Sequence, residues 1–182
     1  MSLDATGVKN ESDVRGRQLP EPGTYHGIVQ HVDDSQDQHD AIIVELEVLA
    51  GDTDGQRGRT LRHMMFLNDE GQYTDRHLRF ALAVGLIRPG EAKEPDWKEA
   101  EGRQLVFAVE KRAGKKKDGT AAEFTNVANY GLDLWGVNNP EVADVPKDQK
   151  ALAIMQGGAP AGAAGAQAGA APAAADDPYA NI

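Results

Sequence analysis

Hydrophobic and polar residues alternate most regularly over residues 42–48. Four aliphatic residues fall on one face of an extended chain, and Glu45 and Glu47, which lie between them, fall on the other. Residues 59–67 alternate in the same way and place Arg62 and Phe66 on one face. A period of two residues is typical of an antiparallel strand with one buried face, so both segments are predicted to be strands.

Three further segments, residues 25–32, 104–112 and 123–130, are rich in β-branched and aromatic residues and are also predicted to be strands. Asp118-Gly119 lies between the last two of them. This pair is a strong hairpin signal, because glycine adopts a positive φ without a steric penalty.

One helix is predicted after the third strand. Thr74 or Asp75 can cap its first turn, and Leu78, Ala81 and Leu82 repeat at helical spacing before Gly85. The order of three strands, one helix and two strands predicts an all-β protein with one helix, a five-stranded OB-fold β-barrel. A plain α+β sheet or another five-stranded barrel has the same pattern.

Composition divides the chain into five regions. Residues 157–175 contain only Gly, Ala, Pro and Gln, which cannot bury enough apolar surface to offset chain entropy, so a disordered linker is expected there. The predicted regions are a flexible arm (1–19), the OB-fold domain (20–135), an irregular exit segment (136–156), the linker (157–175) and an acidic-aromatic tail (176–182).

Several classes of protein are disfavoured by composition. The 182 residues include no cysteine, which excludes disulfides, thiolate metal sites and cysteine catalysis. No apolar run approaches the roughly 20 residues of a membrane span, and the first residues do not resemble a signal peptide. A soluble, cytoplasmic protein without membrane contacts is therefore expected.

Charge is unevenly distributed along the chain. The formal net charge is −10, which disfavours a nucleic-acid partner. Residues 33–54 carry eight acids and no Lys or Arg, whereas residues 103–117 carry six bases and one acid. A basic surface on an acidic protein is compatible with this segregation.

Two basic segments and several aromatic residues are candidates for binding nucleic acid. Lys and Arg neutralise phosphates, and exposed aromatic rings stack on bases. The candidates are Arg57, Arg59, Arg62, Phe66, Lys111, Arg112, Lys115, Lys116, Lys117, Tyr130 and Trp135. Two alternatives remain open: the hairpin lysines only keep a hairpin solvated, and the arginines pair with Glu45 and Glu47 across neighbouring strands.

No catalytic or metal-binding pattern is found in the sequence. The five histidines fall on different predicted elements, without a His-Glu-x-x-His helix. The acidic loop over residues 33–40 lacks the glycine and the terminal glutamate of a calcium loop. The chain is therefore predicted to be non-enzymatic, with no metal and no cofactor.

The last seven residues form a candidate docking peptide. Asp176 and Asp177 would be attracted to a basic patch on a partner protein, and Tyr179 and Ile182 could fill an apolar slot there. The alternative is a disordered end without a binding role.

Residues 20–135 contain five short motifs: Pro22-Gly23-x-Tyr25-x-Gly27-Ile28, the strand 42–48, Gly58-Arg59, Phe66-Leu67-Asn68 and Gly102-Arg103-x-Leu105. These motifs resemble those of phage and prophage OB-fold single-stranded-DNA-binding proteins, and the linker and tail resemble those of bacterial members. The usual tail is richer in acids and ends in Pro-Phe, whereas this one ends in Tyr-Ala-Asn-Ile.

This resemblance implies sequence-tolerant binding and protection of single-stranded DNA, or of RNA, during replication, recombination or repair in a bacterial or phage-infected cell. It implies that Arg59, Arg62 and residues 111–117 line the path of the strand. It also implies a homo-oligomer and recruitment of replication or recombination proteins by the tail. The alternative is an OB-fold protein-interaction module that does not bind nucleic acid.

Overall fold

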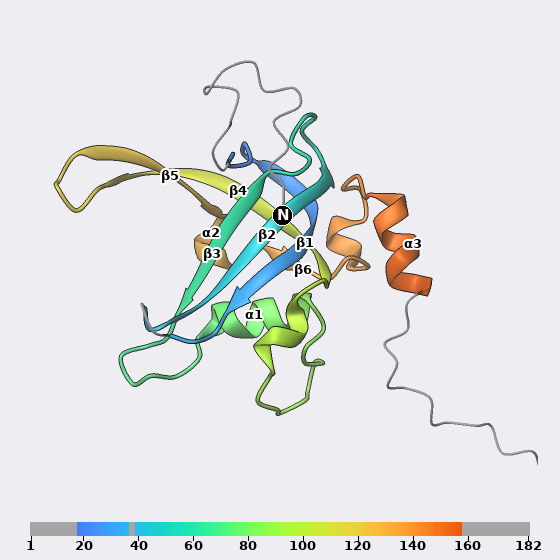
Figure 1. Ribbon diagram of the computed structural model, residues 1–182, viewed down its shortest axis with the longest axis horizontal. Helices are drawn as coiled ribbons and strands as arrows, with labels where there is room; N and C mark the ends of the chain where they lie inside the picture. The colour runs from blue at the N-terminus through green and yellow to red at the C-terminus, as the bar shows by residue number, and fades with distance from the viewer. Residues whose placement is uncertain (1–17, 37–38, 158–182) are drawn as a thin grey trace, which may run out of the picture.

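The computed structural model describes residues 18–36 and 39–157 and consists mainly of β-strands (Figure 1). Six strands form one antiparallel sheet: β1 (Gly23–Asp33), β2 (Ala41–Gly51), β3 (Thr60–Phe66), β4 (Gln104–Lys115), β5 (Ala121–Val127) and β6 (Leu134–Trp135). The helical segments are α1 (Asp75–Ala83), η2 (Trp97–Ala100), α2 (Ala128–Gly131), η3 (Pro140–Val142) and α3 (Gln149–Gly157). The five predicted strands are therefore confirmed, and β6 was not foreseen.

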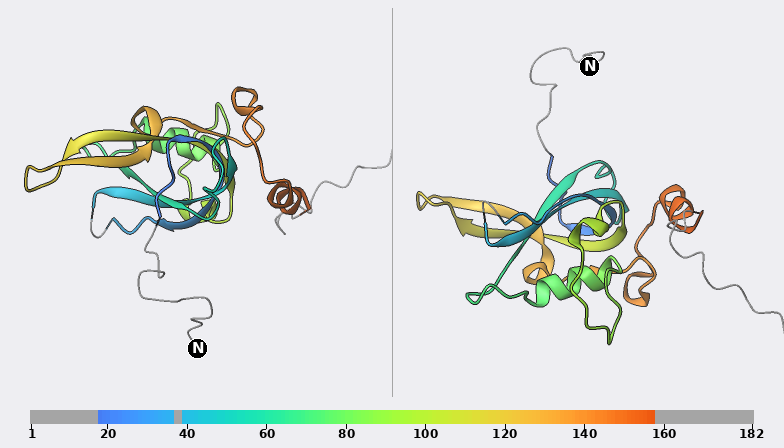
Figure 2. Two further views of the ribbon diagram at one scale, coloured as in Figure 1. Left: turned by 90° about the horizontal axis from the view of Figure 1, so that it is seen from above. Right: turned by 60° about the horizontal axis from the view of Figure 1, so that its bottom comes forward.

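The strand order is β3-β2-β1-β4-β5, and β6 also pairs with β4. The central strand β1 has register shifts at His26/Gly27 and Val29/His31, and such bulges let a strand bend. Gly27 also permits a close crossing, because a Cβ there would lie 2.5 Å from the ring of Phe107. The sheet consequently curls around its core, as both views in Figure 2 show.

The sheet is not closed, so the predicted closed barrel is wrong in this respect. β3 and β5, at the two ends of the strand order, approach one another without pairing. The reason lies in β4: β5 pairs with its residues 109–115, which extend with β5 as an arm beyond the other strands (Figure 1). The inner part of the same edge, at Val106 and Phe107, is occupied by β6.

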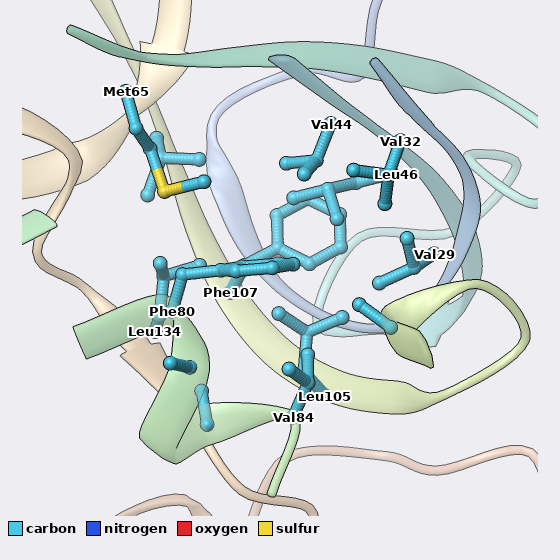
Figure 3. Close-up of a cluster of buried hydrophobic side chains, with 14 of the residues drawn as sticks. Val29, Val32, Val44, Leu46, Met65, Phe80, Val84, Leu105, Phe107 and Leu134 are labelled. Carbon is cyan, nitrogen blue, oxygen red and sulfur yellow. The ribbon is translucent and has the colours of Figure 1, made fainter. Parts of the chain in front are cut away.

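The core lies inside the curled sheet and under α1 (Figure 3). Val44 and Leu46 of β2 are fully buried, which confirms the alternation that predicted this strand, and Phe107 of β4 is also fully buried. Phe80 of α1 closes the core from the open side of the sheet. Burying large side chains in this way stabilises the fold by about 1.5–3 kcal/mol for each.

The helix α1 begins where it was predicted, and Ala81 of the predicted apolar repeat is buried. Thr74 is the N-cap of the helix, and the backbone N–H of Thr74 donates to Nδ1 of His77 over 3.0 Å. His77 and Phe80 also face the core and pack against the ring of Trp97, whereas Leu78 is 50% exposed. Aromatic contacts with η2 thus set the orientation of the helix.

The segment after β6, predicted to be irregular, folds into η3 and α3 and is fixed to the sheet. Nδ1 of His26 accepts a hydrogen bond from the backbone N–H of Asp148 over 3.0 Å, and Nε2 of His26 lies 3.0 Å from Oε1 of Gln104. Nε2 of Gln104 donates to the carbonyl of Ala151 over 2.8 Å. The linker from residue 158 and the tail lie outside the described residues. Among residues 18–36 and 39–157, none of the helices has the length and apolar character that a membrane span requires.

Candidate nucleic-acid interface

A hollow of about 280 Å³, which we call the groove, lies where β3 approaches β5. Its lining comes from β3, α1, β4, β5 and α2: Arg62, His63, Met64, Phe66, Arg76, Glu110, Arg112, Asn126, Val127, Tyr130 and Gly131. A second hollow of about 390 Å³ shares Phe66, Arg76 and Tyr130 with it. The two hollows are therefore neighbours beside the open seam of the sheet.

β3 contributes Arg62, His63, Met64 and Phe66 to the groove. Leu61, His63 and Met65 point inward and are buried, so Arg62 and Phe66 point outward, as the sequence predicted. Phe66 is 48% exposed, although it is a large aromatic residue that directly follows the fully buried Met65. The strand thus presents one cation and one ring to the groove.

The β4–β5 hairpin contributes a polar face. Glu110 lies opposite Asn126, and Arg112 lies opposite Phe124, so these four side chains share one face of the hairpin. The guanidinium carbon of Arg112 lies 3.8 Å from the centroid of the Tyr130 ring, and its Nε lies 3.0 Å from Oε1 of Glu110. A guanidinium held on an aromatic face in this way keeps its other face available for stacking.

A left-handed turn places Tyr130. Asn129 and Tyr130 have φ values of 52° and 56°, and Gly131 follows with 84°. Left-handed conformations cost non-glycine residues of order 1–3 kcal/mol each. A Cβ on Gly131 would lie 2.7 Å from Cε1 of His63, so glycine allows the turn to pack against β3. The strained turn ends β5 three residues earlier than predicted and leaves Tyr130 63% exposed.

Arg76 is a groove residue that sequence reasoning missed. It is half-buried in the first turn of α1 and lines both hollows. A charged residue on the polar side of a short helix gives no signal of its own in the sequence. Its place in the site follows only from the packing of α1 beneath the seam.

His63 lies at the base of the groove and is uncharged. Burial, together with the positive charge of Arg76 and the neighbouring His77, lowers the pKa of His63 to about 3. Its Nε2 has no hydrogen-bond partner among the described residues. The positive charge of the groove is therefore carried by three side chains, Arg62, Arg76 and Arg112, which we call the groove arginines.

Three predicted binding residues are held elsewhere by carboxylates, and we call Arg57, Arg59 and Lys111 the anchored cations. Arg57 forms an ion pair with Asp148, next to α3. Glu21 lies 2.6 Å from Nζ of Lys111 and 4.0 Å from Nη1 of Arg59.

Glu21 is the shared partner in this cluster. The hydrogen bond from Lys111 lowers the pKa of Glu21 and raises that of Lys111. The anticipated pairing with Glu45 and Glu47 is replaced by Asp148 for Arg57 and by Glu21 for Arg59. Arg62 does lie directly opposite Glu45, on β2.

The remaining predicted residues also lie outside the groove. Lys115, Lys116 and Lys117 are exposed at the tip of the hairpin arm, where Gly119 takes the predicted positive φ. Trp135 pairs with β4 through β6, and its Nε1 donates to Glu141 over 2.7 Å. The structure thus brings together Arg62, Phe66, Arg112 and Tyr130 from the predicted set.

The chemistry of the groove is that of stacking and anion binding. Two exposed rings and three guanidinium groups surround it, and aromatic–base stacking with nearby cations is a common way to hold a single nucleic-acid strand. Among residues 18–36 and 39–157, no group of three or more His, Cys, Asp or Glu side chains could hold a metal ion.

No protein-family model matches the chain, and no curated protein is significantly similar to it. A function must therefore be inferred from the groove and its surroundings.

Proposed function

We propose that the protein binds single-stranded DNA in the groove without catalysing a reaction. Phe66 and Tyr130 stack on bases, while the groove arginines contact phosphates. The observation that carries this proposal is the convergence of these five side chains, from β3, α1, β4 and α2, around one depression.

Exposure of the two rings supports stacking. A large aromatic side chain in a small domain usually contributes to the core, yet Phe66 is 48% exposed and Tyr130 is 63% exposed. Stacking on a base is worth about 1–3 kcal/mol and tolerates every base, because every base has a π-face. Sequence-tolerant binding, of DNA or RNA, follows from this chemistry.

We further propose that the sheet is an open variant of the OB-fold. The strand order β3-β2-β1-β4-β5 and the position of α1 between β3 and β4 are compatible with this fold. The hairpin arm, with Lys115, Lys116 and Lys117, would extend the electrostatic reach of the groove. The tail residues Asp176, Asp177, Tyr179 and Ile182 would recruit replication or recombination proteins, and the protein would act as a homo-oligomer in the cytoplasm.

Titration of fluorescent oligo-dT at two salt concentrations tests the proposal. Each phosphate contact adds about −0.7 to the slope of log K against log salt, so three contacts predict a slope near −2. The titration is run with the full chain and with residues 158–182 removed, because the tail carries negative charge. Absence of binding at micromolar protein and low salt would favour the protein-interaction module instead.

A further inference from the structure

The base of the groove carries a carboxylate that phosphate binding does not explain. Glu110 lies opposite Asn126 in the hairpin register, and both side chains line the groove. A carboxylate beside a phosphate path weakens binding through repulsion. A role in contacting something other than phosphate would account for its position.

The carboxylate has an unmet acceptor. Oε1 of Glu110 is buried and accepts no hydrogen bond from the described residues, although Nε of Arg112 lies 3.0 Å away. Leaving a buried acceptor without a donor is costly, and the cost is larger for charged groups. The side chain as a whole remains 30% exposed and lines the groove, so a ligand that displaces Arg112 from Oε1 can contact both oxygens of the carboxylate.

Asn126 supplies the complementary group. Its Nδ2 donates over 3.3 Å to the carbonyl of Phe124, two residues away on the same strand, which is a long hydrogen bond. Because Asn126 is exposed, this amide can donate to a ligand instead. Glu110 and Asn126 together therefore offer an acceptor pair next to a donor.

Guanine has the matching edge. Its N1–H and N2–H₂ groups are adjacent donors that suit the two oxygens of one carboxylate, and its O6 accepts from an amide. Thymine has one N–H between two carbonyl oxygens, which a carboxylate repels. Cytosine and adenine each place their amino group beside a ring acceptor.

We propose that the groove holds one guanine of the bound strand, with its Watson–Crick edge on Glu110 and Asn126 and its ring against Phe66 or Tyr130. This inference rests on the proposed function and limits its sequence tolerance at a single position. The rest of the strand is held by stacking and charge, which do not distinguish bases.

Fluorescence anisotropy with short labelled oligonucleotides tests the proposal. The probes are an all-thymidine strand, the same strand with one central guanine, and the same strand with inosine, which lacks the 2-amino group, at that position. Since the strand can slide to place its guanine in the groove, wild-type protein should bind the guanine strand about tenfold more tightly than all-thymidine. Inosine should fall between them.

Two variants assign the preference to residues. Glu110→Gln should bind the all-thymidine strand at least as tightly as wild type, because a negative charge is removed, and should lose most of the guanine preference. Asn126→Ala, at an exposed position, should lower the ratio of the affinity for the guanine strand to the affinity for the all-thymidine strand. Glu123→Gln is the matched control: it removes one charge from the other face of the same hairpin, so the preference should persist.

The possible failures are distinguishable. Equal wild-type affinity for the guanine and thymidine strands would overturn the guanine site and leave the proposed function standing. An absence of binding to every strand would overturn both. A full guanine preference retained by folded Glu110→Gln and Asn126→Ala proteins, with folding checked by thermal unfolding, would also overturn the site.

Discussion

The anchored cations and the groove arginines lie on the sheet or on segments packed beside it, and they differ in what their charged groups contact. Each anchored cation is held by a carboxylate from a distant part of the chain: Arg57 by Asp148, and both Arg59 and Lys111 by Glu21. These ion pairs connect the entry segment and the start of α3 to the sheet.

The groove arginines are not held by carboxylates from distant parts of the chain. Arg112 lies over the ring of Tyr130 and pairs with Glu110, two residues before it on β4. Arg62 and Arg76 form no ion pair with another residue in ranges 18–36 and 39–157. Arg59 and Arg62 are three residues apart in the sequence, yet they belong to different sets. A cluster of basic residues in a sequence therefore does not indicate how many of them are available to a ligand.

The strongest test of this comparison replaces each set as a whole. Changing the three groove arginines to glutamine should weaken oligo-dT binding by at least about a hundredfold, because a charged hydrogen bond is worth about 1.5–3 kcal/mol. The salt slope should fall by about 2. Anisotropy titrations measure both.

The matched control changes the three anchored cations to glutamine. It should lower the unfolding temperature and leave the slope unchanged. If the control lost as much affinity as the groove variant, the distinction between the two sets would be refuted.

Removing the rings should have the next largest effect. The double variant Phe66→Ala, Tyr130→Ala should bind oligo-dT at least about thirtyfold more weakly, because two stacking contacts are worth about 1 kcal/mol or more each. Both rings are exposed, so stability should change little. Leu78→Ala, which removes an equally exposed apolar side chain from α1, should bind normally. Normal binding by the double variant would exclude stacking at these rings.

Acid should destabilise the folded protein, in part through His63 at the base of the groove. His63 has a pKa of about 3 in the folded protein and an ordinary pKa near 6.5 when unfolded, so only the unfolded chain takes up this proton between those values. The contribution of neutral His63 to the free energy of unfolding is complete above pH 6.5. As the pH decreases below that value, this contribution falls by at most about 1.4 kcal/mol per pH unit.

His63→Met tests this dependence. Denaturant unfolding from pH 7 to pH 4 should show that the free energy of unfolding falls less steeply with decreasing pH in the variant. The difference in slope should correspond to at most one proton fewer taken up on unfolding. Burial also lowers the pKa of His26 and His77, so some slope should remain. Identical slopes in variant and wild type would mean that His63 does not titrate as described.

The smallest effect is expected at the hairpin arm. Changing Lys115, Lys116 and Lys117 to glutamate should weaken binding only severalfold at low salt, and less at higher salt, because these side chains lie outside the groove and act over a screened distance. Titration at two salt concentrations checks this. A loss of affinity as large as that of the groove variant would indicate that the strand binds to the hairpin arm rather than in the groove.

Local patterns predicted the strands and the exposed side chains on β3. Alternation in residues 59–67 was sufficient to place Arg62 and Phe66 outward and Met65 inward. The start of α1 at Thr74 followed from its capping chemistry. These features depend on neighbouring residues, which a sequence displays directly.

Features that depend on distant contacts were not predictable. β6 has two residues and exists because the inner edge of β4 needs a partner at Val106 and Phe107. The left-handed conformation of Asn129 and Tyr130 depends on how Gly131 packs against β3. Burial of α1 through His77 rather than Leu78 depends on aromatic contacts with η2, and the role of Arg76 depends on that packing in turn.

The hydrogen bonds of His26 determine where α3 lies on the protein. They fasten the start of α3 to the back of β1, and α3 lies on the side of the molecule away from the hairpin arm (Figures 1 and 2). A strand bound in the groove would therefore leave α3, which ends at Gly157, uncovered on the opposite side of the molecule.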